Sequence, residues 1–165
     1  MVPRVLTLVR SQVETPDTFT MELAAPDGVE AFPFRPGQFN MVGVPGVGEV
    51  PISISGDPRS PRSVFHTTRE VGAVTRALKK LRPGAPVTVR GPFGRPWPIE
   101  SAKNRDVVLV AGGIGLAPLR PVIDEVMANR SDYGRFLILY GTRTPKDIIY
   151  AKQLSRWRAQ SSMEC

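Results

Sequence analysis

Short runs of alternating apolar and polar residues dominate the first hundred positions of the chain. A period of two predicts strands that bury one face, and turn formers such as Pro36-Gly37 separate the runs. Helical spacing occurs once in this part, from Val74 to Leu81, and stops before Pro83-Gly84. We therefore predict a small, closed, antiparallel β-barrel with strands near residues 5–10, 19–23, 38–44, 51–55, 64–68 and 87–90.

The hydrophobic pattern changes after about residue 101. Residues 107–111 are continuously apolar, which is typical of a parallel strand buried on both faces. Helical spacing at 118–129 and a second apolar run at 136–140 follow. The order strand, helix, strand predicts the first half of a doubly wound α/β domain with a parallel sheet. We place the two domains at residues 1–101 and 102–165.

A last helix is predicted after the second apolar strand. Thr144 is suited to cap it, Pro145 to occupy its first position and Asp147 its third. Tyr150, Leu154 and Trp157 would then form one apolar stripe along a single helix.

The turn after the first parallel strand contains the glycines Gly112, Gly113 and Gly115, with Ile114 between them. A strand that enters a glycine turn and then a helix lets the backbone approach an anion closely, and the helix start offers unpaired N–H groups. Pro118 stands where dinucleotide fingerprints have a third glycine, and proline also starts a helix well. We expect a nucleotide phosphate here; the alternative is a tight turn without a ligand.

Thr142 and Arg143 follow the second parallel strand, where an NAD site usually places an acidic residue. Arg143 suits a 2′-phosphate or the ribose and adenine side of either nicotinamide cofactor. A solvated arginine near a helix start is the alternative.

Three further groups in the barrel region have a possible chemical role. Gly72, Ala73, Val74 and Thr75 precede a helix and form a second candidate anion cradle, or only a helix cap. Ser53 and Ser55 would share one face of a strand and are suited to bond a flavin, although isolated serines are often structural. His66, the single histidine, has no patterned cysteine or acid beside it, and we predict a packed residue.

Composition narrows the possible classes. The chain has 165 residues, 41% hydrophobic and 22% charged, which is typical of a globular protein. The net charge of +7 comes from scattered basic residues, so we predict no nucleic-acid binding. No apolar run approaches the roughly 20 residues of a membrane helix, and we expect a cytoplasmic protein. The single cysteine, Cys165, excludes an intramolecular disulfide and a cysteine-ligated iron–sulfur cluster in these residues.

Taken in order, the motifs resemble those of the ferredoxin–NADP reductase superfamily. They are RPGQF (35–39), PISIS (51–55), VGAVTRAL (71–78), RGPFG (90–94), VAGGIGLAPL (110–119) and LYGTRTPKDIIY (139–150), and they cover nearly the whole chain. Within the superfamily the sequence is most similar to the flavin-binding electron-transfer subunits of cytoplasmic nickel–iron hydrogenases and of dihydroorotate dehydrogenase.

The resemblance implies an FAD-binding Greek-key barrel followed by an NAD(P)-binding domain. Such proteins move reducing equivalents between NAD(P)H and a partner redox centre through the flavin. The partner would be a hydrogenase or dehydrogenase catalytic subunit, or an iron–sulfur protein. By the same resemblance Pro51, Ile52 and Ser53 lie along the flavin, residues 72–75 cradle its pyrophosphate, and residues 112–115 with Pro118 hold the nicotinamide dinucleotide.

The sequence departs from the superfamily in three places. Val50 stands where an arginine often pairs with the flavin phosphate, so Arg69 or Arg76 is expected to supply that charge, and FMN is possible in place of FAD. A cysteine-rich segment for a 2Fe–2S cluster and the second half of the NAD(P) domain are not present, and we expect a C-terminally truncated chain. A docking subunit without turnover and a stand-alone flavin reductase are the alternative functions.

Overall fold

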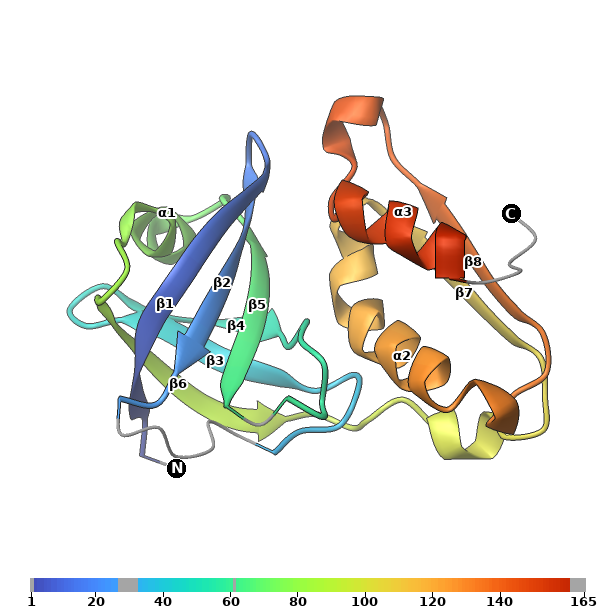
Figure 1. The fold of residues 1–165 in the computed structure, drawn as a ribbon. Helices are drawn as coiled ribbons and strands as arrows, with labels where there is room; N and C mark the ends of the chain where they lie inside the picture. Colours follow the sequence, from blue (N-terminus) through green and yellow to red (C-terminus); the bar gives the residue numbers. More distant parts are fainter. Residues whose placement is uncertain (1, 27–32, 61, 161–165) are drawn as a thin grey trace.

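The computed structural model describes residues 2–26, 33–60 and 62–160. Six antiparallel strands form the first sheet in the order β4-β3-β6-β1-β2-β5. Their bounds are β1 Arg4–Thr15, β2 Thr18–Ala24, β3 Phe39–Val44, β4 Gly48–Ser53, β5 Ser63–Arg69 and β6 Pro86–Phe93. Helix α1, Ala73–Lys80, connects β5 to β6. The predicted strands and this helix are confirmed, and they form the left half of the molecule in Figure 1.

The two edge strands of this sheet approach each other beyond the end of β4. Ile54 forms an isolated antiparallel bridge with His66 on β5, and the Ser55 N–H donates to the Phe65 carbonyl over 2.8 Å. The pairing with β3 thus ends at Ser53, although the Ile54 N–H still donates to the Gln38 carbonyl just before β3 over 3.0 Å, and the chain then pairs with β5. The strand predicted to run to Ser55 therefore ends two residues earlier, because its continuation brings the sheet edges together as in a barrel.

The second unit is a short parallel sheet covered by helices. Strands β7 (Val107–Gly112) and β8 (Phe136–Gly141) pair in parallel, with α2 (Leu116–Ala128) between them in the chain and α3 (Ala151–Gln160) after them. Short 3-10 helices occupy Ile99–Ala102, Gly113–Gly115, Arg130–Asp132 and Pro145–Asp147. This arrangement confirms the predicted β-α-β-α order and the fold class.

One face of the parallel strands is buried and the other is exposed. Alternate positions such as Val107, Ala111 and Phe136 join α2 and α3 in one apolar cluster. On the opposite face Val108 is 56% exposed and Val110 70% exposed. The second core is therefore one layer of helices on one layer of strands, whereas a doubly wound sheet has helices on both faces.

The helix predicted after Thr144 forms as two separate pieces. Thr144 does begin a first turn: its carbonyl accepts from the Asp147 N–H over 3.0 Å, and its own N–H and hydroxyl donate back to the Asp147 carboxylate. That turn ends at Asp147, and Tyr150 takes a φ of +56° before α3 begins. A left-handed residue cannot continue a helix, so the single predicted helix is wrong at this point.

The two apolar cores are separate clusters. The first lies inside the antiparallel sheet and includes Leu6, Phe19 and Leu78. The second includes Ile123 and Trp157, and Ile99 and Ala102 pack against it from the connecting segment. The division at residue 101 stays a prediction, and Cys165 lies outside the described residues.

Candidate functional site

The glycine turn lies at the carboxyl end of the parallel strands, as the sequence predicted. Gly112 and Gly141 are register partners at the last position of β7 and β8. A Cβ atom added at Gly112, Gly115 or Gly141 would meet no atom within 4 Å. The edge of the sheet is therefore open at three glycines, and a ligand can reach the backbone there without displacing protein atoms.

Backbone donors gather at the same edge. Gly113–Gly115 form one 3-10 turn that leads directly into the 13-residue helix α2, so the positive end of the helix dipole lies at this turn. The Leu116 N–H is itself bonded to the Gly113 and Ile114 carbonyls. Ile114 is half-buried and packs on the second core. Pro118 lies in the first turn of α2, where a missing N–H costs little.

The residues after β8 flank this opening. Thr142 is half-buried, and its hydroxyl donates to the Thr144 carbonyl over 3.0 Å. Arg143 is exposed. Asp147, the nearby acid in the chain, accepts from Thr144. The exposed cations on this side are Arg143 and Lys146, of which Arg143 is nearer to the end of β8 in the chain.

The second predicted cradle, at residues 72–75, is built differently from the expectation. The Thr75 hydroxyl accepts the N–H groups of Val71 and Gly72, each at 2.9 Å, and donates to the Gly72 carbonyl at 3.1 Å. This hydroxyl is thus occupied within the turn. The Ala73 and Val74 N–H groups, at the start of α1, remain as donors, and a Cβ at Gly72 would meet open space.

Arg69 connects the barrel to the glycine turn. It ends β5, and its Nε lies 3.2 Å from an Asp17 carboxylate oxygen. A terminal guanidinium nitrogen lies 3.9 Å from where a Cβ of Gly113 would be. Arg69 is therefore placed at the junction of the two units, whereas the other candidate cation, Arg76, is exposed on α1.

The strand predicted to line a flavin forms the free edge of the antiparallel sheet. On β4, Pro51 is exposed, and Ile52 and Ser53 are half-buried. Ile52 and Ile54 turn toward the first core, so Ser53 and Ser55 lie on the opposite face of this segment. Ser55 is nevertheless covered: it has no exposed surface, and its hydroxyl lies 3.0 Å from that of Thr67.

His66 is a packed residue, as predicted. It has no exposed surface; one ring nitrogen lies 3.0 Å from the Ser53 carbonyl and the other 3.2 Å from the Asn40 amide. Nδ1 must donate to the carbonyl, so Nε2 accepts from Asn40. Burial lowers the pKa of His66 to about 4, which keeps the ring neutral.

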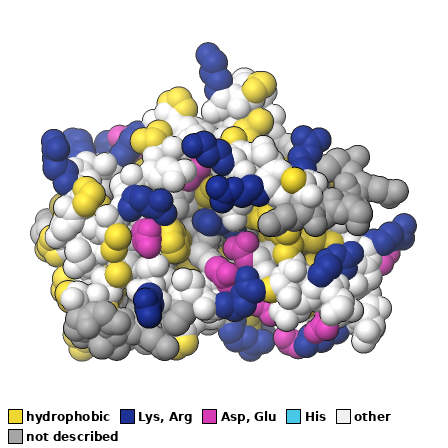
Figure 2. Space-filling view, in the orientation of Figure 1, with side chains coloured by type: hydrophobic (Ala, Val, Ile, Leu, Met, Phe, Trp, Pro, Cys, Tyr) yellow, Lys and Arg dark blue, Asp and Glu magenta, His cyan; other side chains and the backbone are white. Residues whose placement is uncertain are grey.

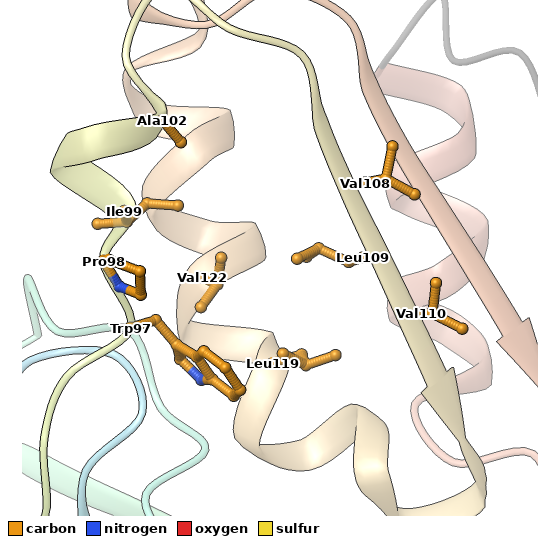
Figure 3. Close-up of a pocket in the computed structure, with 9 residues that line it drawn as sticks. All are labelled: Trp97, Pro98, Ile99, Ala102, Val108, Leu109, Val110, Leu119 and Val122. Carbon is orange, nitrogen blue, oxygen red and sulfur yellow. The ribbon is translucent and has the colours of Figure 1, made fainter.

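Sequence reasoning missed an apolar cavity beside β7. It has a volume of about 320 Å³ and is lined by Trp97 and Pro98, by Leu109 and Val110 of β7, and by Leu119 and Val122 of α2. Figure 3 shows Leu109 turned toward α2, and Val108 and Val110 on the other side of the strand. Because its walls are apolar side chains, the cavity offers little to a charged cofactor.

Surface charge and metal ligands indicate no additional site among the residues that the structure describes. Lys and Arg side chains are scattered over the face in Figure 2, with acidic side chains among them. Among the described residues, no three His, Cys, Asp or Glu side chains gather as a metal site. No helix in the described ranges is long and apolar enough to cross a membrane.

Known proteins match this chain in sequence and in fold. Residues 109–165 match the family described as "Oxidoreductase NAD-binding domain". With the gamma subunit of sulfhydrogenase 1 of Pyrococcus furiosus the chain is 37% identical over 94% of its length and 53% of that protein. With a probable electron transfer subunit of dihydroorotate dehydrogenase B (NAD(+)) of Methanocella arvoryzae it is 39% identical over 91% and 51%.

Solved structures superpose on nearly the whole chain. Phthalate dioxygenase reductase superposes with a TM-score of 0.84 at 21% identity, over 98% of this chain and 51% of that one. Ferredoxin-NADP+ reductase of Plasmodium falciparum gives 0.78 at 17%, over 95% and 65%. The chain has the ferredoxin–NADP reductase fold. The predicted resemblance is thus confirmed, and this ferredoxin–NADP reductase-like chain spans about half the length of the curated relatives above.

Proposed function

We propose that this chain binds a flavin, FAD or FMN, on its barrel and NADH or NADPH at its glycine turn. It would pass reducing equivalents between the nicotinamide and a partner redox centre. The observation that carries the proposal is the open, glycine-lined end of the parallel sheet next to Arg69 of the barrel. A bound flavin supplies the chemistry: it accepts hydride from the nicotinamide and releases single electrons.

The residues have separate tasks in this proposal. Pro51, Ile52 and Ser53 on the free edge of β4 lie along the flavin, and the N–H groups at the start of α1 hold its phosphate. Gly112–Gly115 and the start of α2 hold the nicotinamide dinucleotide, and Thr142 and Arg143 bind its ribose side. Arg69 supplies phosphate charge at the junction, since Val50 has none.

The partner is proposed from the relatives' names. One relative is a gamma subunit of a sulfhydrogenase and another an electron transfer subunit of a dehydrogenase. We therefore propose a second redox subunit, such as a hydrogenase or dehydrogenase catalytic subunit or an iron–sulfur protein, as the electron acceptor or donor.

Absorbance spectroscopy tests the first half of the proposal. Purified protein mixed with FAD or FMN and then desalted is expected to retain the two-band flavin spectrum. NADH or NADPH is expected to bleach that spectrum without oxygen. A colourless protein that retains neither flavin contradicts the enzyme proposal and favours the alternative, a docking subunit without turnover.

Two alanine variants separate the two cofactor sites. Gly112→Ala and Gly72→Ala each add one methyl group where no protein atom lies within 4 Å, so both proteins should fold. Gly112→Ala is expected to weaken NAD(P)H about tenfold, equivalent to about 1.4 kcal/mol, and to leave flavin affinity unchanged. Gly72→Ala should do the reverse. Titrations in which both variants weaken the same ligand would reject the assignment of the sites.

A further inference from the structure

Tyr150 belongs to the second unit but its side chain is buried against the barrel. It precedes α3, is 5% exposed and has a φ of +56°. Its hydroxyl contacts the hydroxyl of Thr67 on β5. Its backbone N–H donates to a Glu14 carboxylate oxygen on β1 over 3.1 Å. The barrel therefore holds this residue at both its main chain and its side chain.

The groups that receive Tyr150 form one continuous chain of hydrogen bonds on the outer face of the barrel, since they alternate along their strands with core residues such as Phe19 and Met21. Thr67 lies 2.9 Å from Thr20, hydroxyl to hydroxyl, and Thr20 donates to the other Glu14 oxygen over 2.8 Å. The circuit closes because the same carboxylate accepts from the Tyr150 N–H. We call Glu14, Thr20, Thr67 and Tyr150 the hydroxyl ring.

The carboxylate of Glu14 fixes the direction of every hydrogen bond in the ring. A carboxylate only accepts hydrogen bonds, so the Thr20 hydroxyl donates its one proton to Glu14. Thr20 must then accept from Thr67, and Thr67 in turn must accept from Tyr150. The phenol is thus held as a donor, and burial raises its pKa. Ser55 also reaches Thr67, which links the ring to the segment that follows β4.

Arg120 supports the same contact from α2. Its guanidinium lies 4.9 Å from the centre of the Tyr150 ring and 5.9 Å from that of Phe65 on β5. Arg120 follows the glycine turn by little more than one helical turn. The position of the turn relative to the barrel is therefore fixed through α2 as well as through Tyr150.

We propose that Tyr150 is a positioning residue that sets the geometry between the flavin strand and the nucleotide-binding turn. The proposal rests on the proposed function. Hydride transfer requires close, aligned reacting atoms, and a displacement of about 1 Å can cost up to about a hundredfold in rate. The hydroxyl ring joins the Ser55 segment to the second unit, so it controls that alignment without touching either cofactor.

The variant Tyr150→Phe removes the phenol hydroxyl and keeps the aromatic side chain. Tyr133→Phe is the matched control. Tyr133 is also buried in the second unit, but its hydroxyl has no hydrogen-bond partner among the described residues. With the purified flavin-loaded chain, stopped-flow reduction at saturating NAD(P)H is expected to slow about tenfold in Tyr150→Phe only. Flavin affinity, half-saturating NAD(P)H and reduction by dithionite should match the wild type. Equal rates for all three proteins would overturn the proposal.

Thr67 provides a second, independent pair of variants if Tyr150→Phe folds poorly. Thr67→Ser keeps the central hydroxyl and is expected to retain the wild-type rate, whereas Thr67→Val removes it and should slow reduction to a similar extent. Because the two groups act in series, Tyr150→Phe combined with Thr67→Val should be no slower than either single variant. Independent, multiplying losses would contradict a shared ring.

Amide hydrogen exchange distinguishes failure of this proposal from failure of the proposed function. Without any cofactor, Tyr150→Phe is expected to lose protection at β5 and at the start of α3, and Tyr133→Phe is not. A wild-type chain that NAD(P)H cannot reduce would reject the function while this exchange difference still tests the ring. Unchanged exchange in Tyr150→Phe would reject the ring itself.

Discussion

His66 shows how a single buried residue shapes the response of the molecule to pH. Its ring joins Ser53 at the end of β4 to Asn40 on β3, and it has no exposed surface. The neutral form satisfies both partners, and the charged form cannot accept from Asn40. The residue therefore links stability to pH and takes no part in the proposed chemistry.

We expect acid to destabilise the chain through His66. The folded pKa is about 4 against an ordinary value of 6.5, so the unfolded chain binds the proton more tightly. The stabilisation is complete above about pH 6.5 and is lost as pH falls toward 4. Urea unfolding should show wild type losing about 2.5 kcal/mol more than His66→Gln between pH 7.5 and 4.5. Parallel pH profiles would contradict this.

At the scale of elements, β3 and β6 meet at a register shift between Phe39 and Met41. Asn40 lies at this shift and has no exposed surface. Gly91 on β6 faces it with a φ of +149°, and a Cβ there would overlap the Asn40 side-chain oxygen. Both the backbone conformation and the lack of space require glycine at this position.

Gly91→Ala is therefore expected to lower the free energy of unfolding by about 2 kcal/mol or more. Gly141→Ala is the control, because its added methyl group would meet nothing within 4 Å. Thermal and urea unfolding of the two variants provide the comparison. A Gly91→Ala protein as stable as Gly141→Ala would show that Asn40 moves aside at no cost.

The sequence predicted the elements better than their ends. Alternation located β4, but it could not reveal that Ile54 leaves β3 to bridge His66, since both pairings suit the same apolar pattern. Likewise Tyr150, Leu154 and Trp157 have ideal helical spacing. Tyr150 is nevertheless left-handed, because the barrel binds both its backbone N–H and its hydroxyl. Thr67 and Tyr150 lie 83 positions apart, so no local pattern reports their contact.

The candidate site was likewise predictable only in part from the sequence. The place of the glycines at 112–115 was predictable because it depends only on the local backbone between one strand and one helix. The occupied hydroxyl of Thr75 and the burial of Ser55 depend on neighbours that only the folded chain supplies.

At the scale of the whole molecule, the junction between the units also contains mixed charges. Apart from burial, the charges of Arg120 on the same helix and of Arg59 in the barrel lower the pKa of Asp124 on α2, and the charge of Asp57 in the barrel raises it. Burial raises the pKa of Asp124 to about 6, so its charge opposes folding at neutral pH. This effect has the opposite pH dependence to that of His66.

Asp124→Asn is expected to stabilise the chain at neutral pH. The folded pKa of about 6 exceeds the ordinary value of 3.8, so stability is lost as pH rises from about 4 to 6. The gain from Asn should be about 2 kcal/mol larger at pH 7.5 than at pH 4.5, measured by urea unfolding. Asp132→Asn is the control, because the Asp132 side chain is 45% exposed. A gain that does not change with pH would contradict the burial of the charge.

The pairing of the first strand with the last strand of the barrel matters for synthesis on the ribosome. Arg4 pairs with Val89, so β1 has one free side until nearly the whole barrel has been translated. Contacts this distant in sequence form slowly. The strands β7 and β8 are nearer neighbours in the chain and pair through one intervening helix. During translation the N-terminal half must therefore remain incomplete for longest, although it emerges first.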